Sequence, residues 1–559
     1  MRSGWTLLTM LAMQGVLRAP FLFGLLVAPL SLLGCGHVLR TPDGPRTPTV
    51  TFGANRVDPI VPPRSRRQSD VNCRLLTADS VPEAESFAIA ASALVAHEAW
   101  TVRFRRNDHG ARRTLRGLYV AAAAPLWLTG GRPTRQALAL LATLDGAAAY
   151  GLEPRDYGVD RLSALASELV AARASSAACA AERRAQFDVT LSATALALVS
   201  DLHYGRIDPR AAGFDLGAPR ADDLDLASVL RALAHADDVG RALASIEPRF
   251  YHYRLLEQAL ARYRQLEEGV PTLAPRVRQI ELTLERWRWL PDFKTPPIIV
   301  NIPEFRLFAF RTTADRAADI LQMDVIVGRT YPRNRTPVFV ADMTSVIFRP
   351  YWDVPRSITV SEMLPQIRAK PGFLAAEHLE IVRSASDAAA ALPPTPDNID
   401  ALAAGTARLR QRPGPDNALG LIKFVLPNAN DVYLHSTPAQ QLFRRQRRAF
   451  SHGCIRVSDP VALAAYVLRE TPGNWTPEKI EAAMYGPESR RVRLARPIRV
   501  MILYGTVLAK EDGEVLFFND IYGQDRRLEQ LLGLAPLIKA GGSLHRPSAS
   551  VPAAPLPRR

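Results

Sequence analysis

The spacing of hydrophobic residues first predicts a long helical region. Between residues 81 and 275, apolar side chains recur every three or four positions, which places them on one face of an α-helix. One such set contains Ala137, Leu138, Leu141 and Leu144, and a later one contains Leu255, Leu256, Ala259, Leu260 and Tyr263. We therefore expect residues 81–275 to form a helical scaffold domain.

After Pro291 the pattern changes to short runs of branched and aromatic residues, which favour β-strands. The earlier runs are Pro297–Ile302, Leu307–Phe310, Met323–Val327 and Val346–Phe348. The later runs are Leu421–Leu426, Val432–Leu434, Ile498–Val500 and Val515–Phe518. The chain is thus expected to be α+β, with a mostly β domain at residues 276–535.

Residues 357–430 interrupt the strand pattern. They contain Glu362–Arg368, an Ala-rich stretch and the Pro/Gly-rich segment Gln411–Asp416. Insertions of this length in compact domains are commonly lids or binding loops. We predict a helical or loop insertion in the β domain.

The N-terminal residues have the pattern of an export signal. An apolar run from Ala19 to Gly34 follows Arg18, and Leu32–Cys35 resembles a lipobox, which would make Cys35 the lipidated N-terminus. Residues 1–35 are then a lipoprotein anchor, with an ordinary signal peptide or an uncleaved anchor as alternatives. Because Gly36 follows the cysteine instead of Asp, we expect a periplasmic protein tethered to the outer membrane.

Two further segments lack any helical or strand period. Residues 36–80 are rich in Pro, Arg, Ser and Thr, which is typical of a flexible linker, and the Pro/Ala/Arg-rich residues 541–559 are predicted to be a disordered tail. The remaining chain has ample core, since 47% of the 559 residues are hydrophobic. We expect a multi-domain globular protein.

The formal net charge of +15 does not indicate a nucleic-acid partner. The positive residues are almost all Arg, and no aromatic-interleaved nucleic-acid module accompanies them. A basic surface favours contact with anionic cell wall or with phospholipid headgroups. We therefore predict membrane association through the anchor or lipid and no nucleic-acid binding.

The clearest candidate chemistry is a cysteine beside two histidines. Ser451–Arg456 reads Ser-His-Gly-Cys-Ile-Arg, and His435 precedes Cys454 by 19 residues. A cysteine nucleophile needs a thiolate, and an imidazole is the usual base that provides it. Gly453 allows a sharp turn, so its N–H and that of Cys454 are candidates for an oxyanion hole. A helical pattern at Pro460–Leu468, with Ser458 and Asp459 as capping candidates, follows this motif.

The residues alone leave other interpretations of this cysteine open. A lone Cys beside a His is commonly a small buried residue. A zinc site is also conceivable, although two His and one Cys without a Cys-x-x-Cys partner make a poor zinc signature. Of the other cysteines, Cys73 and Cys179 could pair in an oxidising compartment, but nothing shows that they are close, and we expect no required disulfide.

Several separated blocks together resemble the L,D-transpeptidases, which cross-link bacterial peptidoglycan. The blocks are Trp287–Pro291, Val325–Arg329, Thr336–Val338, Pro350–Pro355, His435–Pro438, Phe450–Val457 and Asp520–Gly523. They cover residues ~275–530 in the family's order, which is far more specific than one short motif. The resemblance identifies the insertion at 357–430 as the capping subdomain over the cleft.

The helical part is similar to the scaffold domain of the larger Gram-negative members. The similarity lies in Leu118–Tyr119, Pro125–Trp127 and Tyr150–Tyr157, although core packing would also explain these aromatic residues. Larger members commonly carry a helical peptidoglycan-binding module between scaffold and catalytic domain. Here Tyr263–Leu266 leads almost directly to the Trp287 block, which leaves no room for that module.

The resemblance implies a thioester mechanism. Cys454 would attack the carbonyl of the third residue of a stem tetrapeptide and release the terminal D-Ala, while His435 takes and returns the proton. A diaminopimelate amine of a second stem would then form a 3→3 cross-link. Water as acceptor would give an L,D-carboxypeptidase, and a lipoprotein substrate would give a lipoprotein-to-peptidoglycan ligase or hydrolase.

Two alternatives come from other classes, namely a non-catalytic cell-wall-binding lipoprotein and a zinc hydrolase.

The neighbours of the two catalytic candidates have supporting roles in this interpretation. His452 lines the oxyanion hole or has a structural role, and Ser436 orients His435 through its backbone. Arg456 suits a substrate carboxylate or braces the loop, whereas Tyr433 and Trp352 form cleft walls or belong to the core. No cofactor and no metal are expected, and the oligomeric state is left open.

Overall fold

The computed structural model describes residues 82–100, 102–106, 108–120, 124–171, 177–217, 224–291, 295–312 and 320–537. The predicted anchor at 1–35 with Cys35, the linker at 36–80 and the tail at 541–559 lie outside the described residues. Among the described residues, no helix is long and apolar enough to cross a membrane.

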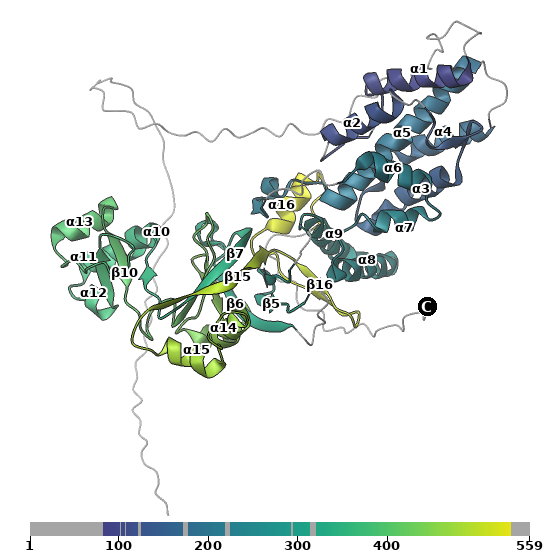
Figure 1. Ribbon diagram of the computed structural model, residues 1–559. Coiled ribbons are helices and arrows are strands. Elements are labelled where there is room, and N and C mark those ends of the chain that lie inside the picture. The colour runs from purple at the N-terminus through teal and green to yellow at the C-terminus, as the bar shows by residue number, and fades with distance from the viewer. Residues whose placement is uncertain are drawn as a thin grey trace, which may run out of the picture. The chain divides into compact units, whose positions relative to one another are not determined.

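The region after residue 82 is helical, as the apolar spacing predicted. Its helices are α1 (Glu83–Ala96), α2 (Asp108–Tyr119), α3 (Arg135–Asp145), α4 (Val159–Ala171), α5 (Ala177–Tyr204), α6 (Leu226–Ala234) and α7 (Val239–Ala244) (Figure 1). Capping side chains fix several starts: Thr134 accepts from the Ala137 N–H and Asp225 from the Ser228 N–H. Most of these helices pack their apolar faces against α5.

Most of the aromatic residues singled out in the helical region are core residues, and Tyr150 is half-buried. Tyr119, Trp127 and Tyr157 are all buried, which confirms the packing interpretation. The buried carboxylate of Asp188 on α5 accepts the Tyr119 hydroxyl at 2.6 Å and the Leu126 and Trp127 N–H groups at 2.8 Å each. Three donors thus offset the cost of burying one charge.

One residue of the predicted helical face is misplaced. Leu138 is 48% exposed, whereas Ala137, Leu140, Leu141 and Leu144 are buried. A residue next to Ala137 in sequence lies about 100° farther round the helix, so Leu138 points away from the core and Leu140 takes its place.

The helical region continues past residue 275. Helix α8 (Tyr251–Gly269) leads through the 3₁₀ turn Pro271–Leu273 into α9 (Ala274–Arg288), which packs against α8. Residues 251–291 are fully described and hold no separate module between α8 and the first strand of the β domain. The link between α8 and α9 is thus a single 3₁₀ turn.

The β domain is built around a closed sheet. Its strands are β4 (Ile298–Asn301), β5 (Arg306–Ala309), β6 (Leu321–Gly328), β7 (Val338–Phe348), β11 (Ile422–Val425), β12 (Leu434–His435), β14 (Ile455–Val457) and β15 (Arg490–Leu503). They follow the order β11-β12-β14-β6-β5-β4-β15-β7, and β7 also pairs with β11, which closes the sheet into a barrel. The short strand β13 (Ala449–Ser451) pairs with β6.

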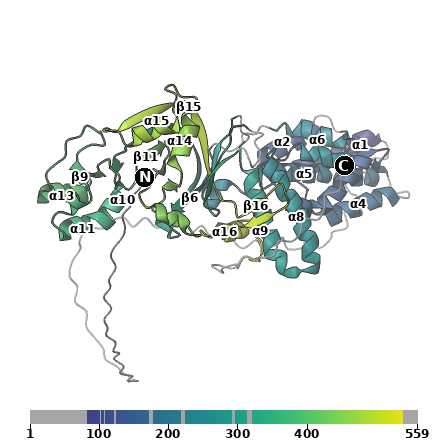
Figure 2. The same cartoon turned by 90° about the horizontal axis from the view of Figure 1, so that it is seen from below.

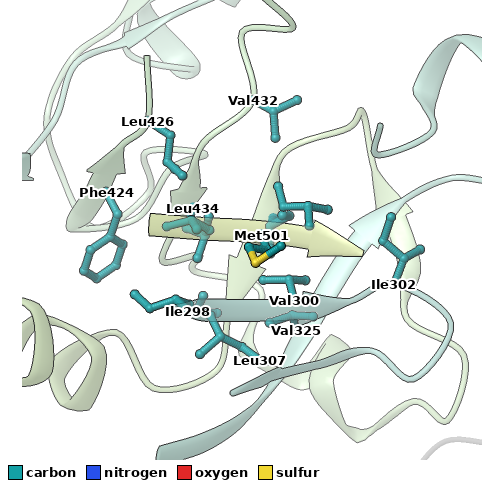
Figure 3. Packing of buried hydrophobic residues seen from close by; sticks show 14 of the residues in the cluster. Ile298, Val300, Ile302, Leu307, Val325, Phe424, Leu426, Val432, Leu434 and Met501 are labelled. Atoms are coloured by element: carbon teal, nitrogen blue, oxygen red, sulfur yellow. The ribbon is translucent and has the colours of Figure 1, made fainter. Parts of the chain in front are cut away.

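The barrel interior is apolar. Ile298, Val300 and Leu307 face Val325 and Met501 in the packed centre (Figure 3). β3 (Phe214–Asp215), which belongs to the helical region in sequence, pairs in parallel with β7. The two parts therefore share a sheet.

Two strands are much longer than the apolar runs indicated. β7 begins at Val338 and β15 at Arg490, because both extend beyond the core as a paired ribbon whose side chains are partly polar. Near the C-terminal end, β17 (Val515–Phe517) lies within the predicted run Val515–Phe518, whereas its partner strand β16 (Val507–Ala509) and helix α16 (Gln524–Leu531) were not predicted.

The insertion has a core of its own. Its sheet contains β8 (Trp352–Asp353), β9 (Leu379–Val382) and β10 (Arg408–Gln411). Its helical segments are α10 (Arg356–Ile358), the π-helical turn Thr359–Met363, α11 (Leu364–Ala369), α12 (Phe373–Ala376) and α13 (Pro396–Ala404), and α10, α11 and α13 group together in Figure 2. This sheet spans residues 352–411, so the insertion begins and ends earlier than the predicted 357–430, and β11 already belongs to the barrel.

The cysteines differ from the prediction at one position. Cys179 on α5 forms a disulfide, which corrects the expectation that no disulfide is required. Cys73, its candidate partner in the sequence, lies outside the described residues. Cys454 is a free thiol.

Candidate active site

The site is organised by three neighbouring strands. His435 on β12 stands directly opposite Lys423 on β11 and Arg456 on β14. Directly opposed residues on neighbouring strands share one face of a sheet, so the three side chains form a row. Cys454 immediately precedes β14, and the sheet register therefore brings it beside the strand that carries His435.

The surroundings of His435 hold it neutral. The side chain is 4% exposed, and its Nδ1 lies 2.5 Å from the Ser436 carbonyl oxygen, which accepts a hydrogen bond from that nitrogen. Burial lowers the pKa of His435 to about 3, with the Arg456 charge acting in the same direction. The ring also hydrogen-bonds to the Leu419 backbone. With the proton on Nδ1, the basic lone pair of the neutral ring lies on Nε2.

The thiol of Cys454 is also held in its neutral form. Burial raises the pKa of Cys454, although Tyr433, Lys423 and Arg456 all act to lower it. Its Sγ lies 3.7 Å from the Asp431 carbonyl oxygen. The Tyr433 hydroxyl interacts with Cys454 and with the side chain of Trp352, so Tyr433 lies beside the thiol and Trp352 lies beside Tyr433.

The loop before Cys454 is stabilised by hydrogen bonds within it. The Ser451 hydroxyl donates to the Cys454 carbonyl at 2.6 Å and accepts the Gly453 N–H at 3.1 Å. Gly453 has a φ of +128°, which glycine alone adopts readily. The Gly453 N–H, expected in the oxyanion hole, is therefore already engaged, whereas the Cys454 N–H has no hydrogen bond within the described chain.

Residues distant in sequence, among them Thr336 and Tyr522, stabilise this loop through hydrogen bonds. The Thr336 hydroxyl donates to the Gly453 carbonyl at 2.7 Å and accepts the Gly328 N–H at 2.8 Å. The Tyr522 hydroxyl donates to the Gly328 carbonyl at 2.6 Å and accepts the Thr336 N–H at 3.2 Å. A Cβ at Gly328 would lie 2.0 Å from the Asn334 carbonyl oxygen, so this approach requires glycine. These residues lie in sequence blocks that resemble the L,D-transpeptidases, but the sequence did not indicate their hydrogen bonds to the loop.

Ser436 supports His435 through the backbone. Its carbonyl accepts from the His435 ring, and its hydroxyl accepts the Leu421 N–H at 2.8 Å and donates to the Leu419 carbonyl at 3.1 Å. The hydroxyl therefore fixes the backbone turn that carries the carbonyl. This geometry agrees with the orienting role expected for Ser436.

His452 points to the insertion. Its Nε2 lies 2.8 Å from Glu362 Oε1 in the π-helical turn Thr359–Met363. Both side chains are partly exposed. The contact links the insertion to the loop at 451–454, which the sequence did not predict.

Arg456 carries an unmatched charge next to the thiol. Its Nε is buried without a hydrogen-bond partner, and burial and the Arg329 charge lower its pKa. Lys423, on the other side of His435, is also a cation whose pKa is lowered by burial, while Cys454 acts to raise it. Sequence reasoning missed Lys423, because its place opposite His435 depends on strand register.

No group of three or more His, Cys, Asp and Glu side chains is arranged to hold a metal ion in the ranges that the structure describes.

Two family models match the chain. Residues 113–260 match the one described as a Scaffold domain, and residues 296–477 match the L,D-transpeptidase catalytic domain, which includes His435 and Cys454. A Haemophilus influenzae protein, named provisionally as an L,D-transpeptidase, is 31% identical over 275 residues. These residues make up 48% of this chain and 53% of the relative, so the match spans about half of that relative.

Proposed function

We propose that the protein is a cysteine acyltransferase that makes 3→3 cross-links in peptidoglycan, because residues 296–477 match the L,D-transpeptidase catalytic domain. One observation carries the proposal. His435, a neutral base with its Nδ1 proton fixed by the Ser436 carbonyl, lies on the strand beside the one that Cys454 precedes. This pairing of nucleophile and base is what acyl transfer requires.

In the first half-reaction, Cys454 Sγ attacks the carbonyl carbon of the third residue of a stem tetrapeptide. A C–S bond forms, and the bond to the nitrogen of the terminal D-Ala breaks. The thiol proton passes through His435 Nε2 to the leaving amine, which departs as D-Ala. A thioester between Cys454 and the stem remains.

The protonation states favour proton transfer during the attack. A thiol whose pKa is raised and an imidazole whose pKa is about 3 form a neutral pair at rest. The thiolate therefore forms only as the proton moves to His435. The Cys454 N–H is free to donate to the developing oxyanion.

In the second half-reaction, the side-chain amine of a diaminopimelate residue in another stem attacks the thioester. A new amide bond forms, the C–S bond breaks, and the amine proton returns through His435 to the thiol. Water in place of the amine would give a carboxypeptidase, and a lipoprotein amine would give a ligase. The nature of the acceptor separates these reactions.

We further propose that this reaction takes place in the periplasm, with the chain tethered to the outer membrane through lipid on Cys35. The lipobox-like Leu32–Cys35 and Gly36 support this proposal. Membrane fractionation with Cys35→Ser, which should release the protein from the outer membrane, tests it.

Mass spectrometry of the products tests the activity. Purified protein incubated with disaccharide-tetrapeptides should yield cross-linked dimers with loss of D-Ala, and Cys454→Ser and His435→Ala should yield neither dimers nor a covalent adduct. Tripeptide alone would favour the carboxypeptidase, and a lipopeptide product the ligase. Full turnover by Cys454→Ser would refute the proposed nucleophile.

A further inference from the structure

We propose that Lys423 forms a carboxylate-binding subsite for the donor stem peptide beside Cys454. This inference rests on the proposed function and deepens it, because it names the chemical group that the site recognises next to the scissile bond. None of the sequence motifs contains Lys423, which comes from strand β11.

Strand register places the lysine at the site. Lys423 is the direct partner of His435 across β11 and β12. Its Nζ lies 3.9 Å from the centroid of the Tyr433 ring, and Tyr433 in turn interacts with Cys454. The ammonium is therefore on the side of the sheet where the thiol lies.

The ammonium has no anionic partner in contact. In the part of the chain that the structure describes, Lys423 makes no ion pair within 4.0 Å and no side-chain hydrogen bond. Asp353 and Asp431 are near enough to raise its pKa, but burial has the larger effect and lowers it. A half-buried charge without an anionic partner is costly, and a bound anion would reduce that cost.

Two buried arginines in the described part of the chain show the usual arrangement. Arg286 contacts Asp525 at 2.6 Å, and Arg410 contacts Glu380 at 2.9 Å. Lys423 differs from these two cations because no carboxylate contacts it. The difference occurs where a substrate would lie, which points to a ligand.

A second cation makes the local charge strongly positive. Arg456 flanks His435 on the other side of the row, and its buried Nε also has no partner. Two unmatched cations beside the thiol suit an anionic ligand and disfavour a cationic one.

The donor peptide offers two carboxylates near the scissile bond. One is the terminal carboxylate of the leaving D-Ala, and the other is the side-chain carboxylate of the diaminopimelate at the third position. Either could reach an ammonium beside the attacked carbonyl. The chemistry is the same, so the experiment must separate the two sources.

Kinetics with amidated donors tests the subsite. Wild type, Lys423→Gln and Lys423→Arg are compared on three donors: the unmodified tetrapeptide, one amidated at the terminal carboxylate and one amidated at the diaminopimelate side-chain carboxylate. We expect Lys423→Gln to raise KM on the unmodified donor about tenfold or more, with a smaller effect on kcat. Lys423→Arg should recover part of the loss.

The decisive result is the coupling between lysine and carboxylate. Amidating the recognised carboxylate should raise the KM of the wild type by a similar factor and leave the KM of Lys423→Gln almost unchanged. Amidating the other carboxylate should change the KM of both proteins equally. Equal losses by Lys423→Gln on all three donors would overturn the proposal. So would a fall in kcat at constant KM, which would make Lys423 only an electrostatic aid to the thiolate.

Binding measurements keep this test independent of turnover. Calorimetry with Cys454→Ala and the same donors reports the carboxylate contact even if no product forms, so failure of the proposed reaction and failure of the subsite give different results. Lys479→Gln is the matched control, because this exposed lysine donates to the Gly473 carbonyl in a separate loop. It should leave the affinity for all three donors unchanged.

Discussion

The electrostatic environment of Cys454 predicts an unusual reactivity profile. Burial raises the pKa of its thiol and lowers that of His435 to about 3, so no stable thiolate–imidazolium pair forms near neutral pH. Alkylation by iodoacetamide should therefore rise about tenfold per pH unit between pH 6 and 8.5, because only the thiolate reacts. Labelling rates by mass spectrometry measure this.

A plateau in that pH range would contradict the neutral pair. Cys454→Ala is the control for labelling at other residues, since Cys454 is the free cysteine in the described part of the chain. The low pKa of His435 has a second consequence. The base remains unprotonated at pH 5, so its protonation should not reduce kcat/KM at that pH.

Single residues differ in how far the sequence could predict them. Cys454 and His435 were predictable because the Ser-His-Gly-Cys motif and the upstream His lie close together in the chain. Lys423 and Tyr522 were assigned no role there, since their positions depend on which strands become neighbours. The Gly453 N–H was expected to be free, but the Ser451 hydroxyl takes it, a local contact that a motif does not specify.

At the level of elements, a polar contact joins the insertion to the loop at 451–454. Glu362 accepts from His452 at 2.8 Å, and the π-helical turn that carries it is a rare conformation often found at functional sites. Glu362→Ala should increase hydrogen exchange in residues 359–369 and in the loop at 451–454. Because both side chains are partly exposed, we expect Glu362→Ala to lower the free energy of unfolding by no more than about 1 kcal/mol.

A second ion pair in the insertion provides the control. Arg368 contacts Asp400 at 2.7 Å, and both residues belong to the insertion. Arg368→Ala should change exchange in the insertion without changing it in residues 451–454. If Glu362→Ala leaves the loop as protected as this control does, the contact does not couple the two elements.

Elements with a clear hydrophobic period were predictable, and those with a mixed pattern were not. Helix α14 (Pro460–Leu468) has the predicted bounds, and Asp459 caps it by accepting the Ala462 N–H at 2.9 Å. Only the apolar part of β15 was predicted, because the arginines at the start of this strand interrupt the alternation of apolar and polar residues. The two residues of β3 carry too little pattern to indicate pairing with β7.

At the scale of the molecule, a boundary near residue 275 cannot separate two independent parts. Helix α9 crosses that position, packs with α8, and also contacts the β16–β17 hairpin. Its Arg286 reaches Asp525 on α16 at 2.6 Å, and both groups are buried. The sequence showed where the hydrophobic period changes, but contacts between distant segments follow only from the fold.

Breaking the Arg286–Asp525 pair should therefore weaken the whole assembly. Arg286→Met leaves the Asp525 carboxylate buried without its cation, at a cost of about 3–5 kcal/mol, whereas Arg286→Met combined with Asp525→Leu should recover most of this stability. Urea unfolding followed by tryptophan fluorescence measures both variants. Equal stability of the single and double variants would mean that the pair contributes through packing and not through charge.

The pH dependence of the single variant provides an independent check. Burial already raises the pKa of Asp525, and Arg286 acts to lower it, so removing the arginine should raise this pKa further. A folded-state pKa above the unfolded value of about 4 gives stability at low pH that is lost as the pH rises through the folded-state value. The deficit of Arg286→Met relative to wild type should therefore be larger at pH 8 than at pH 5, and the double variant, which lacks the carboxylate, should show no such trend.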